Sequence, residues 1–434
     1  MKTIEKETDC GTIRGLMNDE GICEFRGIRY AAAERWKYPV PVNNWDGVYD
    51  ATSFGAACVQ MRTYDDESLK KPEPFYYREF RKGMHFDYSE DCLFLNIWSP
   101  AYACGAPVVL YIHGGAFMGG CGNEMHMNGT EFAKRGVIFV SINYRLGVFG
   151  FLCSRELEEE SGHTGNYGLY DQVEAIRWIR RHIASFGGDP ERITLYGQSA
   201  GAMSIQQLVL SPSVKPLIAG ACMSSGGGIG REFAAVTSVH DSLSYCARIT
   251  KRLGVTLEEW RRKTPEEVLN AVKVSADREL LNHLCPHIDG NLIPEDPAKA
   301  VSEGKMADIP YLLSTNSEDM LPEILNRMAV SFCTSVNKLH RKPAWYFRFT
   351  RRLPGDDAGA FHSAELWYTM GTLRHCWRPM EEKDYALSNA LLSALCCFAE
   401  NGYPKSPAIP EWRPMSRPSG PYLEFGDTGV QIHA

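Results

Sequence analysis

The chain of 434 residues predicts an α/β fold with a mostly parallel central sheet and helices on both faces. Apolar, β-branched runs alternate with segments of helical periodicity through the first half. A serine bracketed by glycines follows one of these runs directly. No shift in composition separates the two halves, so we expect a single domain over residues 1–434.

The first half supplies the strands of the expected sheet. Residues 107–115, PVVLYIHGG, form an apolar run that ends in two glycines. Residues 137–145 form a second run that is rich in β-branched residues. Continuous apolar runs of this kind are typical of strands that are buried on both faces. Residues 192–196, RITLY, predict the strand that leads into the glycine-bracketed serine.

Helices are expected on either side of that strand. Apolar residues recur at spacings of three or four from Leu169 to Ile183, and Gly187 follows them. This pattern predicts an amphipathic helix that ends before the glycine. A further helix is expected immediately after Ser199, with its N-terminal amides and dipole beside that serine.

The second half of the chain has a different character. Residues around 230–300 predict short amphipathic helices with charged faces, which cap or insert into the fold rather than join the sheet. Residues 309–319 predict a strand that ends in a polar turn, and residues 345–350 predict a further aromatic strand. The proline-rich tail from Pro404 onward favours extended chain over helix.

The segment TLYGQSAGA, residues 194–202, carries the strongest chemical signal. A serine in a Gly-x-Ser-x-Gly turn between a strand and a helix lies on a sharp, strained bend that exposes its Oγ. Gly197 and Gly201 are required there because a side chain at either position would clash. Ser199 is therefore a candidate nucleophile, as in a serine hydrolase.

A base must follow such a serine in chain order, and four histidines lie beyond the strand at 309–319. His340 and His433 are expected to be exposed, and His375 falls within an expected helix. His362 follows a turn of glycine and alanine and precedes a helical start, so it is the best candidate base.

The acid that orients this histidine has two candidates at the end of the strand, Glu318 and Asp319. Their chemistry alone does not decide between them. Asp289 is a rival by position, but its Asp-Gly context is more simply a turn. The oxyanion of an acyl-transfer intermediate also needs donors, and the glycines of HGGAF, 113–117, together with the amide of Ala200 can supply them.

These motifs closely resemble the type B carboxylesterase family, the relatives of cholinesterases and para-nitrobenzyl esterases among the α/β-hydrolases. The resemblance runs nearly from end to end and rests on long, specific segments. They are FRGIRYA (25–31), WDGVYDATSFGAACVQ (45–60), SEDCLFLNIWSP (89–100), HGGAF (113–117), NYRLGVFGF (143–151), the segment 165–202 and GAFHSAEL (359–366).

The resemblance implies an α/β-hydrolase fold and a Ser-His-Asp triad. Asp319 stands where the family usually has glutamate, and an ungapped alignment favours it over Glu318. Only 43 positions separate Asp319 from His362, which implies a reduced helical cap and a more open pocket. The residues implied are Ser199, Asp319 and His362 as the triad, and Gly115, Ala116 and Ala200 as donors of the oxyanion hole.

Cys58 and Cys92 match the first disulfide of secreted members of the family. The start of the chain aligns with the family's first strand and carries no signal-peptide pattern, so we expect a cytoplasmic protein with both thiols reduced.

The expected function is hydrolysis of small acyl or aryl esters through an acyl-enzyme. A catalytically silent binding or adhesion relative, and a lipase or amidase with the same triad, are the alternatives. Gln198 replaces the glutamate of cholinesterases, which disfavours choline esters. Four aromatic side chains are expected near the pocket: Tyr76, Tyr77, Phe86 and Phe117.

Composition excludes several partner classes. The net charge of -7 and the lack of a long basic block disfavour nucleic acid, and no apolar run approaches the roughly 18 residues of a membrane span. We expect no metal or organic cofactor, because Pro286 interrupts the HxxxH spacing at 283–287. The physiological ester and the oligomeric state stay open.

Overall fold

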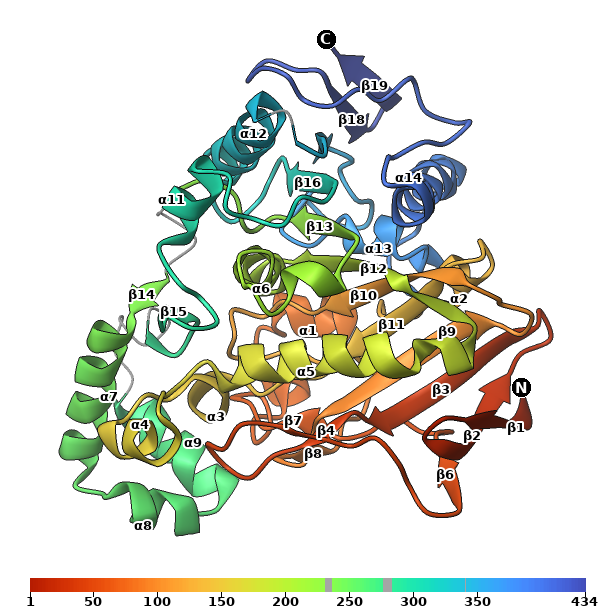
Figure 1. Cartoon of the computed structure of the whole chain (residues 1–434). Helices are drawn as coiled ribbons and strands as arrows, with labels where there is room; N and C mark the ends of the chain where they lie inside the picture. The colour runs from red at the N-terminus through yellow and green to blue at the C-terminus, as the bar shows by residue number, and fades with distance from the viewer. Residues whose placement is uncertain (231–235, 276–282, 340) are drawn as a thin grey trace.

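The computed structural model describes residues 1–230, 236–275, 283–339 and 341–434 (Figure 1). The remaining positions include His340, so the expectation that this histidine is exposed lies outside the described residues.

A single large sheet runs through the molecule, and its centre is parallel. The strand order across it is β1-β2-β3-β9-β11-β10-β12-β13-β16-β17-β18-β19. The parallel strands are β11 (Ile138–Ile142), β10 (Ala106–Ile112), β12 (Gly188–Gln198), β13 (Gly220–Ser224), β16 (Tyr311–Asn316), β17 (Ala344–Phe349) and β18 (Tyr422–Gly426).

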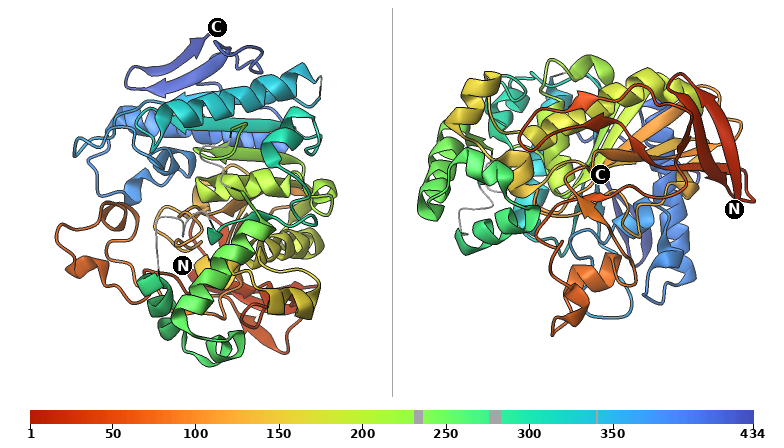
Figure 2. Two further views of the ribbon diagram at one scale, coloured as in Figure 1. Left: turned by 90° about the vertical axis from the view of Figure 1, so that its left-hand side faces the viewer. Right: turned by 90° about the horizontal axis from the view of Figure 1, so that it is seen from below.

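Antiparallel strands extend this sheet at both edges, so the two ends of the chain lie at opposite margins (Figures 1 and 2). The edge strands are β1 (Lys2–Thr8), β2 (Gly11–Met17), β3 (Ile22–Arg29) and β9 (Phe94–Pro100) on one side, with β6 (Val48–Asp50) beside β2, and β19 (Gly429–His433) on the other. Three short pairs lie apart from the sheet: β4 (Ala31–Ala32) with β5 (Val40–Pro41), β7 (Ala57–Cys58) with β8 (Tyr88–Ser89), and β14 (Thr237–Ser238) with β15 (His287–Ile288).

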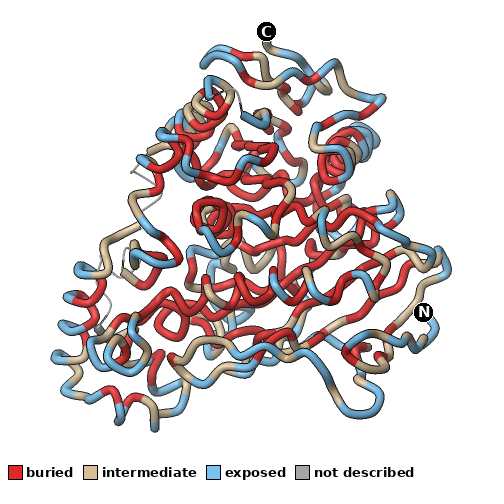
Figure 3. Tube along the Cα trace, viewed as in Figure 1, coloured by how far each residue is buried: buried red, intermediate tan, exposed pale blue. Residues whose placement is uncertain are grey.

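Helices cover both faces of the sheet, as the sequence predicts (Figure 1). One face packs against α5 (Tyr167–His182), α6 (Ala200–Leu208), α11 (Pro297–Ser302) and α12 (Pro322–Lys338). The other packs against α2 (Thr130–Ala133), α13 (Leu366–Thr369) and α14 (Glu382–Asn401). The buried trace in Figure 3 follows the strands and the inner sides of these helices.

The expected helix after residue 168 is α5, and a glycine ends its last turn. A 3-10 turn, Ile183–Phe186, follows α5, and Gly187 then takes a left-handed conformation with φ of 87°. A Cβ on Gly187 would lie 2.3 Å from the backbone oxygen of Ala103, so only glycine fits.

The helices expected around 230–300 form a separate layer beside the sheet, seen at the lower left of Figure 1 and in front on the left of Figure 2. They are α7 (Val239–Leu253), α8 (Leu257–Arg262) and α9 (Pro265–Ser275), with α3 (Gly147–Phe151) and α4 (Arg155–Ser161) alongside. Their apolar faces share a small core around Trp36 and Trp260. A capping box between Thr256 and Glu259 starts α8.

The structure corrects one expectation about this fold. Cys58 and Cys92 are joined in a disulfide, with their Cα atoms 4.9 Å apart, so the expectation of reduced thiols is wrong in this structure. The two cysteines are 34 positions apart in the sequence, but both lie in the buried core, where the fold brings their sulfur atoms together. The cytoplasmic location stays a prediction.

The tail after Pro404 is extended and contains no helix, as the sequence predicts. The extended, proline-rich chain after Pro404 ends in the hairpin of β18 and β19, which the sequence did not reveal. β18 joins the sheet by pairing with β17, which lies about seventy residues earlier, and a local sequence pattern cannot show such pairing.

None of the described helices is both long and apolar enough to cross a membrane.

A buried ion pair fastens the loop closed by the disulfide to the C-terminal half. Glu79 lies in the last turn of the short helix α1 (Phe75–Phe80), and both its side chain and that of Arg378 are fully buried. Arg378 Nε and Nη2 each donate to Glu79 at 3.0 Å. The indole N–H groups of Trp367 and Trp377 donate to the same carboxylate at 2.8 and 2.9 Å.

We expect Glu79→Ala to lower the free energy of unfolding by about 3–5 kcal/mol, because it leaves the Arg378 charge without its main buried partner. Urea unfolding followed by tryptophan fluorescence measures this change. Glu411→Ala is the matched control, since its pair with Arg413 is exposed, and its unfolding midpoint should equal that of wild type. Equal midpoints for all three proteins would contradict the role given to Glu79.

Candidate functional site

Ser199 lies at the sharp turn between β12 and α6. Its backbone has φ of 55° and ψ of -125°, a conformation that non-glycine residues rarely adopt. The two flanking glycines allow the turn: a Cβ on Gly197 would lie 2.6 Å from Gly201, and a Cβ on Gly201 would lie 2.0 Å from the Ile112 oxygen. The segment 194–202 therefore adopts the nucleophile-elbow geometry that its sequence predicts.

His362 and Asp319 meet although 43 positions separate them. Asp319 follows the carboxyl end of β16, and His362 lies on the loop before α13. His362 Nδ1 forms a short hydrogen bond with Asp319 Oδ1. Both residues are 6% exposed, so the pair is shielded from water.

The Asp319 carboxylate is held by further donors. Its Oδ2 accepts from Ser225 Oγ at 2.6 Å and from the Asn316 amide at 3.1 Å. Burial acts to raise the pKa of Asp319, but its hydrogen bond to His362, the charge of that residue and the hydrogen bonds from Ser225 and Asn316 together keep the pKa below its usual value. A carboxylate that stays ionised can orient an imidazole and stabilise its protonated form.

Glu318, the rival acid, points elsewhere. Its Oε1 accepts from Arg352 Nη1 at 2.8 Å, and its Oε2 accepts from the Ala360 amide at 3.0 Å. The geometry thus decides between the two neighbours: Asp319 contacts the imidazole of His362, and Glu318 braces the loop before it. Asp289 instead closes a turn, where its Oδ1 accepts from the Asn291 amide at 2.9 Å.

The other nitrogen of His362 faces Gln198. The Gln198 side-chain amide donates to His362 Nε2 at 3.2 Å. Within the described part of the chain, Ser199 Oγ makes no hydrogen bond to His362, although both residues line the same cavity. The sequence marks Gln198 as a departure from cholinesterases, but only the folded structure shows its contact with the candidate base.

The loop after β10 brings backbone donors beside the serine. Ala116 has a φ of 55° and Gly115 a φ of 112°, which turns the loop back over Ser199. Among the described residues, the N–H groups of Gly115, Ala116 and Ala200 donate to no other protein atom. Amides that are left free beside a nucleophile are the parts of an oxyanion hole.

A cavity of about 240 Å³ joins these groups. Ser199, His362 and Gln198 line it together with residues 114–116 of the loop after β10, called the candidate oxyanion loop. Of the four aromatic residues expected there, Tyr76 lines the cavity and Phe117 packs in the core against Phe151. Tyr77 and Phe86 line a different hollow. No described residue of 237–300 lines the cavity.

Sequence reasoning missed the residues that support Asp319. Ser225 directly follows β13, the strand beside β16, so the rule that functional groups gather at the carboxyl ends of parallel strands could have found it. Asn316 donates to the Glu365 carboxylate at 2.5 Å, and that carboxyl is fully buried behind Asp319 and His362. This residue is a single glutamate near the start of a helix, and nothing in the sequence marks it as a buried part of the site.

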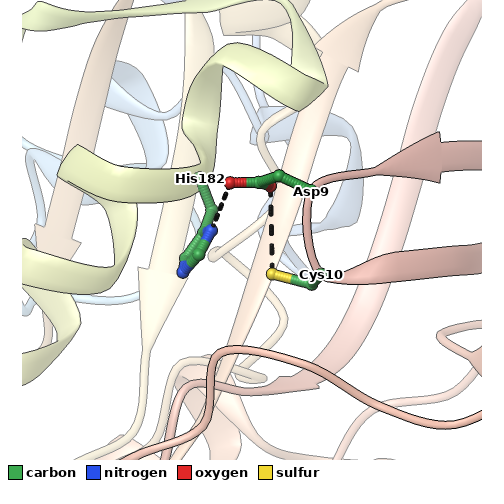
Figure 4. Close-up of side chains that lie close together, drawn as sticks. All are labelled: Asp9, Cys10 and His182. Carbon is green, nitrogen blue, oxygen red and sulfur yellow. Dashed lines mark hydrogen bonds and ion pairs between the residues drawn. The ribbon is translucent and has the colours of Figure 1, made fainter.

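A separate cluster lies outside this cavity. Asp9, Cys10 and His182 have possible metal-ligand atoms within 4.8 Å of one another (Figure 4). His182 Nδ1 lies 2.7 Å from Asp9 Oδ2, and Ser185 Oγ donates to Asp9 Oδ1 at 2.8 Å. These bonds connect the hairpin of β1 and β2 to the end of α5, so we interpret the cluster as a structural contact.

A mostly parallel sheet, a strained serine elbow after a central strand, and an acid and a histidine at the same sheet edge define an α/β-hydrolase. Comparison with known proteins gives the family. Residues 2–332 match the carboxylesterase family model. The chain is 31% identical to the para-nitrobenzyl esterase of Bacillus subtilis (strain 168) over 93% of this chain and 91% of that protein.

Two further comparisons agree. The fumonisin B1 esterase of Sphingopyxis macrogoltabida is 32% identical over 73% of this chain, and the match spans 56% of that esterase. The solved structure of a thermophilic PNB esterase superposes with a TM-score of 0.85 at 28% identity, over 99% of this chain and 97% of that one. The chain belongs to the carboxylesterase family, and this family match together with its esterase relatives identifies a carboxylic ester hydrolase.

The buried Glu365 makes stability depend on pH. Burial raises its pKa to about 7 from an ordinary 4.5, although the Asn316 hydrogen bond opposes this. Between these values the folded protein keeps a proton that the unfolded chain releases, so stability falls as the pH rises through this window.

We expect Glu365→Gln to remove this contribution, and the variant should lose less stability than wild type between pH 5 and pH 8. Thermal unfolding midpoints of both proteins at the two pH values measure the difference. Other titrating groups cancel in the comparison. Parallel behaviour of the two proteins would show that Glu365 does not titrate in this range.

Proposed function

We propose that this protein hydrolyses small acyl or aryl esters through a Ser199-His362-Asp319 triad and an acyl-enzyme intermediate. One observation carries the proposal: His362 is held by Asp319 on one nitrogen and presents the other to the cavity that Ser199 lines. Chain order, elbow strain and free amides support the same assignment.

The first half of the reaction forms the acyl-enzyme. Asp319 accepts a hydrogen bond from the Nδ1–H group of His362, so the proton of the neutral imidazole stays on Nδ1 and Nε2 keeps its lone pair. Nε2 takes the Ser199 proton as Oγ attacks the ester carbonyl, and Asp319 stabilises the imidazolium. The amides of Gly115, Ala116 and Ala200 donate to the oxygen that becomes negative. His362 then gives its proton to the alcohol, which leaves.

The second half returns the free enzyme. Water enters the place of the alcohol, His362 removes a proton from it, and the hydroxide attacks the acyl carbon. The proton passes to Ser199 Oγ as the acid departs. In both halves the hydrogen bond from Gln198 to His362 Nε2 must be replaced by one between Ser199 or its substrate oxygen and that nitrogen.

The cavity supports small substrates. Its volume of about 240 Å³ and the apolar surfaces of Phe80, Met127 and Leu366 favour short acyl or aryl groups over long chains.

Wild type should hydrolyse para-nitrophenyl esters of short acyl chains, and Ser199→Ala should reduce kcat/KM by at least about 10³-fold, because the nucleophile is lost. Release of para-nitrophenol from acetate, butyrate and octanoate esters gives the rates. Equal, slow release by both proteins would rule out the proposed function.

The two neighbouring acids give a sharper test. Asp319→Asn should lower kcat by about 10²–10⁴-fold, because an amide that donates to Nδ1 forces the proton onto Nε2. Glu318→Gln is the matched control and should retain nearly normal turnover, since that side chain contacts Arg352 instead. The reverse pattern would transfer the role of the acid to Glu318.

A further inference from the structure

The side chain of Gln198 contacts the nitrogen of His362 that has to accept the serine proton. The Gln198 amide nitrogen lies 3.2 Å from His362 Nε2, and both residues are buried. An amide N–H group can only donate a hydrogen bond, so His362 Nε2 must accept it with a lone pair. The imidazole that fits this contact is the neutral one, with its proton on Nδ1 beside Asp319.

The loop after β10 limits how the Gln198 amide can lie. Gln198 is the last residue of β12 and directly precedes Ser199. A Cβ on Gly114 would lie 3.0 Å from Gln198 Oε1 and 2.7 Å from the Gln198 backbone oxygen, so glycine lets the loop pack directly against this residue. The amide oxygen therefore lies against the loop, and the amide nitrogen faces His362.

A donor at Nε2 opposes protonation of the imidazole. A proton added to Nε2 would face the N–H group of Gln198, and the hydrogen bond between them would be lost. A hydrogen bond that only the neutral form of a group can make stabilises that form. The contact with Gln198 thus favours the form of His362 that can take the proton of Ser199.

Charged and titratable groups on other elements also face His362. Asp319 favours the protonated imidazole through its hydrogen bond to Nδ1. Glu365 lies directly before α13, and burial raises its pKa to about 7, so it titrates in the range where the base must act. The remaining groups are Tyr76, which donates to the His362 backbone oxygen, and five residues that line the cavity: Arg62, Arg81, His113, Glu124 and His126.

Gln198 differs from all of these groups in the atom that it contacts. Among the described residues, it alone forms a hydrogen bond with His362 Nε2. Burial lowers the pKa of His113 to about 4 and that of His126 to about 3, so both are largely neutral above pH 5. Replacement of Gln198 therefore changes the surroundings of Nε2 while Asp319 keeps its contact with Nδ1.

We propose that Gln198 is a positioning residue that keeps His362 in its neutral form with the proton on Nδ1, and so sets the lower pH limit of ester hydrolysis. This inference rests on the proposed function of Ser199 and His362 and adds a control over the state of the base. Substrate binding then exchanges Gln198 for Ser199 at Nε2.

Gln198→Met tests the donation itself, because methionine has a similar length and no N–H group. The value of kcat/KM for para-nitrophenyl acetate is measured from pH 4.5 to pH 9 at the isosbestic wavelength of the product. The acidic midpoint of this profile should rise by about 0.5 pH unit or more, since the neutral imidazole loses a hydrogen bond. An apolar side chain that acted through burial alone would lower the midpoint, because it further desolvates the protonated imidazole.

Gln198→Glu gives a second, larger shift. A carboxylate at this position accepts from the protonated Nε2, so the acidic midpoint should rise by about one pH unit or more. The same shift should appear when Glu365→Gln is the parent protein, which removes the titration of Glu365 from the comparison.

Gln172→Met is the matched control. Gln172 is a buried glutamine on α5 that donates to Ser204 Oγ at 3.1 Å and lies outside the cavity. Its acidic midpoint should equal that of wild type. Thermal unfolding confirms that each variant is folded, and either Gln198 variant alone is sufficient for the test.

The outcomes separate this inference from the proposed function. Hydrolysis that depends on Ser199, with a midpoint in folded Gln198→Met at or below that of wild type, would overturn the role of Gln198 and leave the esterase assignment intact. An unchanged midpoint in Gln198→Glu, or a shift that disappears in the Glu365→Gln parent, would also overturn it. Absence of Ser199-dependent hydrolysis of para-nitrophenyl acetate would overturn the proposed function itself.

Discussion

The close approach of the β10 loop to the serine elbow constrains the whole site. A Cβ on Gly201 would lie 2.0 Å from the Ile112 oxygen, and a Cβ on Gly114 would lie 2.7 Å from the Gln198 oxygen. The backbones of the strand end, the loop and the first turn of α6 therefore pack with no space for side chains. This contact fixes Ser199 relative to the amides of the candidate oxyanion loop, and the strain at Ser199 is stabilised by the sheet around it.

Buried polar contacts hold the other residues of the candidate site in place beside the serine elbow. Ser225 and Asn316, from the ends of neighbouring strands, hold Asp319, and Asp319 holds His362. The ion pair of Glu79 and Arg378 fastens the helix that carries Tyr76 and Phe80 to the segment after His362. A rigid sheet thus positions one wall of the cavity, while a disulfide-closed loop supplies another.

Local patterns predicted the elements whose signal lies within a short stretch of chain. The strands β10, β11, β12, β16 and β17 and the helices α5 and α6 match apolar runs or helical periodicity in the sequence. The elbow was predictable for the same reason, because Gly197 and Gly201 flank Ser199 directly. The hairpin at the C-terminus was missed, since its place in the sheet depends on the distant strand β17.

The direction in which a side chain points could not be predicted from the sequence and is seen only in the folded structure. Glu318 and Asp319 are neighbours of equal charge, and only the end of β16 decides which one faces His362 and which one meets Arg352. The same holds for Gln198, whose contact with His362 Nε2 joins residues 164 positions apart.

By itself, the sequence determined the class of fold, the nucleophile candidate and the glycines that the elbow needs, because these depend on local backbone geometry and on short-range periodicity. The tertiary structure alone decided which of the two neighbouring carboxylates contacts His362, the disulfide state and the lining of the cavity. The physical reason is that such contacts join residues that lie far apart in the sequence, as Asp319 and His362 or Cys58 and Cys92 do, so they exist only once the chain has folded.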